Sequence, residues 1–555
     1  MVKFYIINLL VIVSISCFGQ AKIDVEKLWT LTKVYGTIKY YNNERDDQYL
    51  DNEMLKILPH LKSPAYDDIN FNQDVLKLLP ANQKNVQPSL PKTSPFTQFN
   101  NIDHINIADF KWIQENRQLT SENKSRLDQL ISLHKKVANT NITHHQIFIH
   151  NENIGLETIS KPEEYILGLI KLWNVMNYFF PYKNLMDNDW DWVLHDEISG
   201  FCAVDSYHEY DILVKKLSSY LNDSHVEIED KYRDDYNVWK LPFSVVIAED
   251  QMIIKSVSDS LSRLYNVNTG DIIETLEGKS YAGLWQEFSN QVSYSTPQAG
   301  RRYFAVFLWH KFNYNDTLVS VTINSNSIIH HESIKTIKLD DFRKFDPWIE
   351  SSGSYKSINE NIGYIKYDNL SYSNLGKAIR NLKNKDYLIL DCRGYNSSLA
   401  NLRLLNFMGN TKIPFAKNYS PNLGFPGVFD NPKMIKVNVP STTSTYRGKV
   451  IVLINERAIS AMESVLMAIE ARRKDAVFIG SPTQGADGEQ NMVILPGNIK
   501  IFYSGNNWQY PDGRQFQRIG IQPDLFIEPT IKSFINNEDV VLNGAIKFIN
   551  EVGLN

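Results

Sequence analysis

Ser460 lies at the point where the sequence changes from a strand pattern to a helix pattern. The run 450–454 is short, apolar and rich in β-branched residues, as expected of a strand covered on both faces. Beyond Asn455 the apolar residues recur at helical spacing, at Met462, Val465, Leu466 and Ile469. Ser460 is therefore predicted to lie in the first turn of a helix, where the helix dipole and the free N–H of Ala461 favour a developing oxyanion. This is the geometry that acyl transfer by a serine nucleophile requires.

The same segment also has a purely structural interpretation. Ser460-Ala461-Met462-Glu463 fits the capping-box pattern S-x-x-E, in which the two side chains satisfy free N–H groups at a helix start and do no chemistry. Because helix caps greatly outnumber nucleophiles, this segment alone favours the cap.

A serine nucleophile needs a base, and the sequence limits the choice of base. No histidine follows His331, so an imidazole must come from upstream. Among the twelve histidines, His225 has the most suggestive setting, because it follows a helical pattern and precedes polar-apolar alternation. It is predicted to lie in a connection beside a strand, where functional residues concentrate, with Asp223 and Ser224 able to fix its tautomer. The alternative is a histidine in a turn that faces solvent.

Composition bounds the class of protein. The chain has 555 residues, 43% of them hydrophobic, which is enough for roughly three to four domains with apolar cores. A formal net charge of -5 provides no basic surface for a phosphate backbone, so nucleic acid is excluded as a partner.

Residues 1–20 have the pattern of an export signal. Lys3 precedes an apolar stretch that ends in small residues, and cleavage is expected near Gln20. We therefore predict an exported protein, periplasmic or extracellular. Cys17 is an alternative lipid-attachment site, although Ser14 stands where such a site prefers leucine. No later segment is long and apolar enough to span a membrane.

The pattern of elements predicts a multidomain α/β protein. Residues 21–80 and 104–240 have helical patterns, and the Pro-, Asn- and Gln-rich stretch 81–103 between them is predicted to be a linker. Residues 241–337 are β-rich. Residues 338–555 alternate strands with helices, which implies a largely parallel sheet. Its strands are expected at 363–367, 387–391, 450–454 and 477–480.

The two helical stretches share a short sequence motif. Lys27-Leu28-Trp29 and Lys171-Leu172-Trp173 are each followed by tyrosines, which suggests a duplicated helical unit. A further helix is predicted over 119–137, with His134 at the edge of a core.

Three aspartates alternate like the start of a calcium-binding loop. The run Asp187, Asp189, Asp191 lacks the loop's glycine and closing glutamate, because Trp192 and Ile198 stand at those positions. We assign the run a helix-start role and predict no metal and no cofactor.

Five segments between about residues 340 and 530 occur together in a fixed order: Gly363-Tyr364-Ile365, Leu390-Asp391-Cys392-Arg393-Gly394, Ser460-Ala461-Met462-Glu463, Ile479-Gly480-Ser481-Pro482-Thr483-Gln484-Gly485, and Gly520-Ile521-Gln522-Pro523-Asp524. Together they resemble the tail-specific protease family of serine peptidases, also called C-terminal processing peptidases, and are nearer its tricorn-like branch than its lysine-dependent branch. The resemblance implies a crotonase-like α/β catalytic core.

The resemblance also implies roles for individual residues. Ser460 takes the place of the nucleophile, and Ala461 supplies one oxyanion N–H. Family members with a lysine base carry it just after the glycine that matches Gly485, where this chain has Ala486. The tricorn-like branch instead uses an upstream serine-histidine pair, which Ser224-His225 matches.

Two departures from the family pattern bear on activity. The family's glycine pair that supplies the second oxyanion N–H reads Ser397-Ser398 here, and Gln517 stands where the tricorn-like branch has a glutamate. Loss of the acid from a serine triad costs a factor on the order of 10⁴ in rate. Glu463 and Glu489 are candidate substitutes for that acid.

The β-rich stretch 241–337 resembles the PDZ-like domain that the family inserts before its catalytic core. Gly270 and Asp271 carry this match, and such domains bind a peptide by adding it as a strand to a sheet edge. The resemblance thus implies a peptide-binding role for these two residues.

The first hypothesis is an exported serine endopeptidase that acts on unfolded or C-terminal protein segments. Ser460 is the nucleophile, His225 the base, Ser224 and Gln517 orient the site, and Ala461 and Ser397 bind the oxyanion. The alternative is a peptide-binding pseudoprotease. In both, the partner is a peptide or protein, and the sequence leaves the oligomeric state open.

Overall fold

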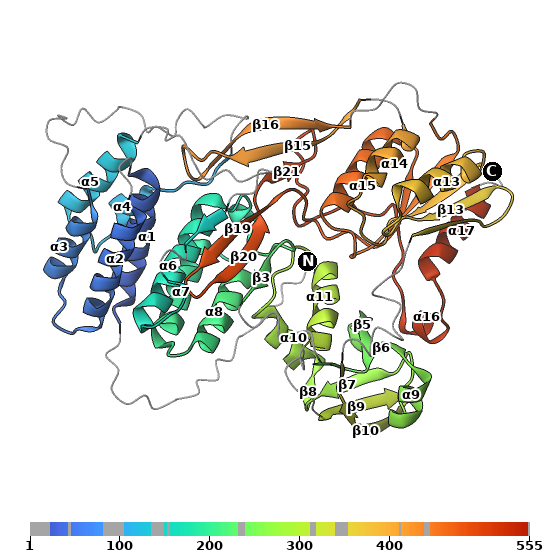
Figure 1. The fold of residues 1–555 in the computed structure, drawn as a ribbon, viewed down its shortest axis with the longest axis horizontal. Helices are drawn as coiled ribbons and strands as arrows, with labels where there is room; N and C mark the ends of the chain where they lie inside the picture. Colours follow the sequence, from blue (N-terminus) through green and yellow to red (C-terminus); the bar gives the residue numbers. More distant parts are fainter. Residues whose placement is uncertain are drawn as a thin grey trace, which may run out of the picture.

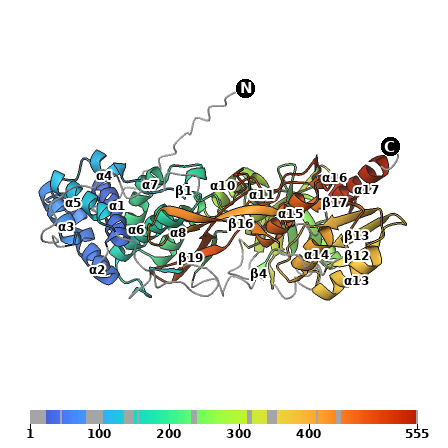
Figure 2. The ribbon, with the colours of Figure 1, turned by 90° about the horizontal axis from the view of Figure 1, so that it is seen from above.

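A computed structural model describes residues 23–42, 46–80, 105–134, 149–152, 156–230, 239–310, 318–338, 353–409, 412–437 and 445–552. The predicted export signal (1–20) and linker (81–103) lie outside these ranges. Figure 1 shows helices at one end of the molecule, a mainly parallel sheet at the other, and a second sheet beside it. Figure 2, turned by 90°, shows that the molecule is long and thin. No helix in the described part combines the length and apolarity needed to cross a bilayer.

The helical end contains two long, mostly buried helices that pack against each other. They are α1 (Val25–Tyr41) and α6 (Pro162–Phe179). A Cβ added at Gly36 of α1 would lie 1.7 Å from the Asn174 Oδ1 of α6, so this approach requires glycine. The surrounding helices are α2 (Asp47–Ile57), α3 (Asp68–Leu78), α4 (Lys111–Glu115), α5 (Ser121–Ser132), α7 (Trp190–Ala203) and α8 (Tyr207–Ser219).

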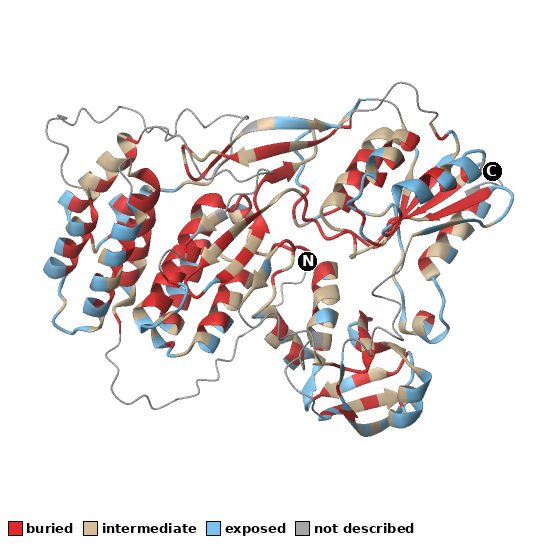
Figure 3. Ribbon diagram, in the orientation of Figure 1, coloured by how far each residue is buried: buried red, intermediate tan, exposed pale blue. Residues whose placement is uncertain are grey.

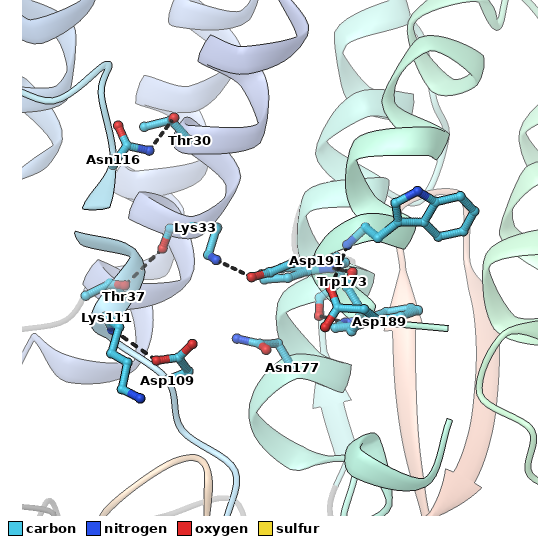
Figure 4. A network of polar contacts seen from close by, with 12 residues as sticks. Thr30, Lys33, Thr37, Asp109, Lys111, Asn116, Trp173, Asn177, Asp189 and Asp191 are labelled. Carbon is cyan, nitrogen blue, oxygen red and sulfur yellow. Dashed lines mark hydrogen bonds and ion pairs between the residues drawn. The ribbon is translucent and has the colours of Figure 1, made fainter. Parts of the chain in front are cut away.

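Ion pairs cross between the two helical units in both directions. The Nζ of Lys33 in α1 lies 2.6 Å from Asp191 Oδ2 in α7 (Figure 4). The same Nζ is 4.5 Å from the centroid of the Trp29 ring. Lys171 of α6 reaches Asp51 of α2 at 2.5 Å. Lys27, which is the motif counterpart of Lys171, pairs instead with Asp24 and Asp68, so the duplicated helical unit stays a prediction.

Two smaller sequence predictions in this region are confirmed. Asp189 caps α7 by accepting from the Trp192 N–H at 2.9 Å, as expected of a helix-start residue. His134 is buried and lies within hydrogen-bond distance of the carbonyls of Tyr41 and Gly424, as expected of a core-edge histidine. The helix predicted over 119–137 is shorter, because α5 ends at Ser132.

The second sheet has the strand order β10-β9-β7-β6-β5, and its strand pairs are antiparallel. Its strands are β5 (Phe243–Ala248), β6 (Gln251–Val257), β7 (Ile272–Leu276), β8 (Lys279–Ser280), β9 (Leu318–Ser325) and β10 (Ile328–Lys335). The accompanying helices are α9 (Asp259–Tyr265), α10 (Tyr281–Ser289) and α11 (Pro297–His310). A short ribbon of β4 (Trp239–Lys240) and β11 (Ile337–Lys338) joins the two ends of this region. Strand β5 forms one edge of the sheet, and α11 packs against it.

The end of the molecule opposite the helices is built on the sheet β12-β13-β14-β17-β18-β22, and we call this part the α/β body. Its strands are parallel except for β12. Its strands are β12 (Ser354–Ser357), β13 (Ile362–Lys366), β14 (Tyr387–Asp391), β17 (Lys449–Ile454), β18 (Val477–Gly480) and β22 (Leu525–Phe526). The four predicted strands are thus confirmed to within one residue. Helices cover both faces: α13 (Tyr372–Leu382), α14 (Ala400–Met408) and α15 (Ala461–Arg472) on one, and α17 (Val540–Val552) on the other, with α16 (Ile531–Ile535) leading into α17.

Two hairpins connect this body to the helices. The first consists of β15 (Pro414–Pro421) and β16 (Val428–Lys436), flanked by β1 (Ile105–Asn106) and β21 (Asn507–Gln509). The second consists of β19 (Gln490–Leu495) and β20 (Ile499–Ser504), flanked by β2 (Ile149–Asn151) and β3 (Glu227–Glu229). The sequence assigned residues 490–504 to the α/β core, whereas the buried side chains of this hairpin belong to the apolar core of the helices (Figure 3).

Candidate active site

Ser460 occupies a strained turn between β17 and α15. Its backbone angles are φ 55° and ψ −126°, a region that residues with a Cβ rarely adopt. The Ser460 N–H lies 2.9 Å from the Ala486 carbonyl and 3.2 Å from Glu463 Oε2. The capping-box pair Ser460 and Glu463 is therefore present, but the Ser460 hydroxyl makes no capping hydrogen bond to α15. The hydroxyl stands at the carboxyl end of an interior parallel strand, where sites of α/β sheets form.

The buried carboxyl of Glu463 holds the loop that follows β18 against this turn. It accepts from the N–H of Gly485 at 2.7 Å, from that of Ala486 at 3.0 Å, and from the Thr483 hydroxyl. Burial raises the pKa of Glu463 to about 8, and the three donors from the loop oppose the rise. Glu463 therefore fixes the position of Ala486, whose carbonyl in turn holds Ser460.

His225 lies in the connection between α8 and β3 and is buried. Its Nδ1 is 2.9 Å from the Ser504 hydroxyl, and its Nε2 has no hydrogen-bond partner among the residues that the structure describes. Burial lowers the pKa of His225, while the charge of Asp223 opposes this shift. The ring is therefore neutral at neutral pH, as a general base must be.

Asp223 is the carboxylate of this cluster and is fully buried. Its Oδ1 accepts from the Ser504 hydroxyl at 2.9 Å, from Gln517 Nε2 at 3.0 Å, and from the backbone N–H of His225 at 3.1 Å. Its Oδ2 accepts from the Ser504 N–H at 2.8 Å. Gln517 thus contacts Asp223 rather than the imidazole.

Sequence reasoning missed Ser504, because strand register brings it to His225. In the antiparallel pair β20–β3, Phe502 lies opposite Glu227, so two residues further Ser504 lies opposite His225. No local motif marks Ser504 in the sequence. The signal that could have found it is the pairing of two strands that are far apart along the chain.

Ser224 positions the loop rather than the imidazole. Its hydroxyl accepts from the Ser295 N–H at 2.9 Å, and its carbonyl accepts from the Tyr303 hydroxyl at 3.0 Å. The same Tyr303 hydroxyl lies 2.8 Å from Gln484 Oε1, in the loop that Glu463 holds. Tyr303 therefore ties the His225 connection to the loop on which Ser460 rests, although no direct hydrogen bond joins Ser460 to His225 in the described part.

The two acids proposed from the sequence as substitutes for the missing glutamate are engaged elsewhere. Glu463 holds the loop after β18, and Glu489 accepts from Asn506 Nδ2 at 2.6 Å. Neither carboxyl forms a hydrogen bond with His225 in the described ranges. The carboxylate nearest to the imidazole network is instead Asp223.

The loop after β14 lies at the same sheet edge as Ser460, because β14 neighbours β17. Ser397 in this loop is exposed, and neither Ser397 nor Ser398 has a positive φ. Asn396 braces the loop: its Nδ2 donates to the Tyr367 carbonyl at 3.0 Å, and its Oδ1 accepts from the Ser398 N–H at 3.0 Å. Serine in place of the family's glycine pair therefore introduces no backbone strain.

A groove of about 440 Å³ lies between the edge strand β5 and α11. Gln298, Arg301, Ala305 and Trp309 line one wall from α11, and the groove reaches Glu456 and Arg457 in the turn before Ser460. An ion pair between Arg301 and Glu528, 2.8 Å apart, ties α11 to the segment that precedes α16.

Gly270 and Asp271, which the sequence marked for peptide binding, do not line this groove. They form the turn before β7, where Gly270 has φ +95° and the Asp271 carboxylate accepts from the Asn268 N–H at 2.6 Å. A Cβ at Gly270 would lie 2.2 Å from Ile535 of α16. The structure therefore gives these residues a turn-forming role.

The aspartates 187, 189 and 191 do not come together as ligands. Asp187 pairs with Arg518 at 2.8 Å, Asp189 caps α7, and Asp191 pairs with Lys33. Within the described ranges, no group of three or more such side chains has a metal-binding arrangement.

A serine in a strained turn at the start of a helix, with a buried histidine network nearby, is typical of hydrolases of the serine-peptidase type. Residues 361–527 match Peptidase family S41. This match falls within the stretch where the five ordered segments predicted a resemblance to a serine peptidase family.

One curated protein and two solved structures are also similar to this chain. A carboxy-terminal-processing protease of Bartonella bacilliformis is 23% identical to this chain over 302 residues. The aligned part covers 52% of this chain and 61% of that protein, so the match spans about three fifths of the relative's length. Mature CPAF complexed with lactacystin has a TM-score of 0.55 at 13% identity, over 70% of this chain and 99% of that one. Mature CPAF alone has a TM-score of 0.53 at 13% identity, over 68% and 99%. The likeness to the two CPAF structures is one of fold.

Glu463→Ala should destabilise the protein by about 3 kcal/mol or more. The substitution leaves the N–H groups of Gly485 and Ala486 without their acceptor, and each buried unsatisfied donor costs about 1–3 kcal/mol. Urea unfolding measures the loss, with the exposed Glu360→Ala as the matched control. Equal stability of the two variants would contradict the role assigned to Glu463.

Proposed function

We propose that this chain is an exported serine endopeptidase that hydrolyses peptide bonds in unfolded or C-terminal segments of proteins. The observation that carries the proposal is the backbone of Ser460, whose φ of 55° holds a serine in a strained conformation at a helix start. Such strain persists where the surrounding structure supports a function, whereas an ordinary cap has extended angles. Export rests on the sequence of residues 1–20.

In this mechanism His225 Nε2 removes the proton from the Ser460 hydroxyl as Oγ bonds to the peptide carbonyl carbon. The N–H groups of Ala461 and Ser397 receive the negative charge that develops on the carbonyl oxygen. The imidazolium then gives its proton to the amine nitrogen as the C–N bond breaks. Water, activated by the same imidazole, releases the acyl group from Ser460.

The groove between β5 and α11 is proposed to hold the substrate chain. Strand β5 is an edge of its sheet, so an extended peptide can add to it as a further strand, as in PDZ-like domains. Because the groove extends to Glu456 and Arg457, a peptide bound on β5 leads toward the turn that carries Ser460. On this proposal, residues 241–337 have the peptide-binding role of a PDZ-like domain. The sheet β12-β13-β14-β17-β18-β22 belongs to the crotonase-like catalytic core.

The alternative is a peptide-binding pseudoprotease on the same fold. One observation favours it: Gln517 is an amide and cannot neutralise an imidazolium as the family's glutamate does. The endopeptidase is preferred because His225 is buried with a free Nε2, which a binding module does not require.

Ser460→Ala should abolish both peptide hydrolysis and covalent labelling by a fluorophosphonate. The reagent bonds only to an activated serine Oγ, and α15 keeps its Glu463 contacts without the Ser460 hydroxyl, which makes no capping hydrogen bond. Intact mass spectrometry of the two proteins measures labelling, and thermal unfolding verifies that stability changes by less than about 1 kcal/mol. The exposed Ser354→Ala on β12 is the matched control, because Ser354 has no part in the proposed mechanism. Labelling that persists in Ser460→Ala would contradict the assignment of the nucleophile.

The rate of labelling should fall at acidic pH with a midpoint below 6.5. Burial lowers the folded-state pKa of His225, so the imidazole stays neutral and able to accept a proton until the pH drops below its ordinary range. The labelling rate measured from pH 4.5 to 7.5 gives this midpoint, and circular dichroism over the same range verifies that the protein stays folded. A midpoint above 6.5 would mean that His225 is not the buried base proposed.

Ala305→Trp should block the groove while leaving the hydrolytic residues intact. The indole would project from α11 between the helix and β5, so the KM for long peptides should rise at least about tenfold, whereas the fluorophosphonate labelling rate stays unchanged. Leu264→Trp on the exposed face of α9 is the matched control. If Ala305→Trp cleaves long peptides as wild type does, the groove is not the substrate path.

A further inference from the structure

We propose that Asp223, acting through the Ser504 hydroxyl, is the acidic positioning residue of His225 and takes the place of the glutamate that Gln517 replaces. The inference rests on the proposed function, because it concerns the residue that prepares His225 as a base. It assigns roles to Asp223 and Ser504 that the five sequence motifs do not contain.

The hydrogen bonds around Ser504 decide the tautomer of His225. A carboxylate can only accept hydrogen bonds, so the single proton of the Ser504 hydroxyl points to Asp223 Oδ1 at 2.9 Å. The oxygen of that hydroxyl then accepts from His225 Nδ1–H, also at 2.9 Å. With the ring proton on Nδ1, the lone pair is on Nε2, the nitrogen that has no partner among the described residues. This is the tautomer that a general base requires.

The charge of Asp223 is left for the imidazole to balance. The four groups that donate to Asp223 are uncharged: the backbone N–H and the hydroxyl of Ser504, the side-chain amide of Gln517, and the backbone N–H of His225. Within the described ranges no lysine or arginine pairs with it. A buried carboxylate without a fixed cation stabilises a positive charge nearby, so it favours the imidazolium that forms when His225 takes the Ser460 proton.

Gln517 fits this arrangement better than a glutamate would. Its Nε2 donates to Asp223 Oδ1 at 3.0 Å, and it is buried. A glutamate at the same place would bring two buried carboxylates together, and one of them would have to bind a proton. The Gln517 amide therefore suits the Asp223 carboxylate, because it donates a hydrogen bond and adds no negative charge. The acid of this network stands two residues before the histidine.

The other titratable groups that sense the charge of Asp223 are phenols. Asp223 contributes to raising the pKa of Tyr182, and that of Tyr303 to about 12, both mainly through burial. Both phenols are therefore neutral throughout the working pH range. Burial lowers the pKa of His225, so its imidazole is the group of this network that takes up a proton as the pH falls below its ordinary range.

The test compares wild type with Asp223→Asn and Ser504→Ala by fluorophosphonate labelling rate and its pH dependence. In Asp223→Asn the amide can donate to Ser504, which turns the hydroxyl proton toward Nδ1 and moves the ring proton to Nε2. Labelling should then fall by a factor on the order of 10³–10⁴, as when a triad aspartate becomes asparagine. Ser504→Ala removes the link while Asp223 stays, so its rate should fall at least about tenfold. Asp74→Asn, a buried aspartate on α3, is the matched control.

A structural role of Asp223 would not move the pKa of His225, so that pKa is the second readout. Titration of His225 by NMR should show a lower pKa in Asp223→Asn than in wild type, and in wild type the proton should be on Nδ1. The inference would be overturned if both variants, Ser504→Ala and Asp223→Asn, kept the wild-type labelling rate and the wild-type pKa of His225. If wild type itself does not label, the proposed function fails, and the NMR comparison still decides the role of Asp223. If Asp223→Asn does not fold, Ser504→Ala gives the same decision.

Discussion

The hairpin of β19 and β20 is the element on which the candidate site depends. It leaves the body that carries Ser460 and is buried among the helices that lead to His225. Its side chains Val493, Leu495, Ile499 and Ile501 are fully buried there, and burying each such side chain contributes about 1.5–3 kcal/mol. The hairpin therefore fixes Ser504 opposite His225 with an energy that a few hydrogen bonds between mobile loops could not supply.

A second constraint acts at Ser460. Its backbone angles cost free energy, on the order of 1–3 kcal/mol for such a conformation, so other contacts must hold them. Glu463 does so by joining the first turn of α15 to the N–H groups of Gly485 and Ala486. The loop after β18, which contains Gly485 and Ala486, thus has a defined position. The Glu463 carboxyl and the Ser460 N–H both hold it there.

The sequence allowed the local parts of this architecture to be predicted and missed the long-range ones. The switch from strand to helix around Ser460 is a local pattern, and the parallel strands were predicted to within one residue because each is a short apolar run. His225 was singled out by its place between a helical and an alternating pattern, and the resemblance pointed to the same residue. Ser504 could not be predicted, since an alternating strand does not reveal its partner, and its place opposite His225 depends on the register of β20 against β3. For the same reason, the sequence suggested Glu463 and Glu489 as substitute acids, although it had already named Asp223 as able to fix the tautomer of His225.

Burial sets the charges of the site. Position 486 has alanine, which offers no cation to the buried carboxyls of Glu463 and Asp487. Burial raises the pKa of Glu463 to about 8 and that of Asp487 to about 7. At neutral pH, Glu463 is therefore mainly protonated and does not repel an oxyanion at the N-terminus of α15. The carboxylate with the closest link to the imidazole is then Asp223, and its charge acts on His225 through a single hydroxyl. On the proposed mechanism, His225 is thus the base in a chain that has alanine at position 486 and glutamine at position 517.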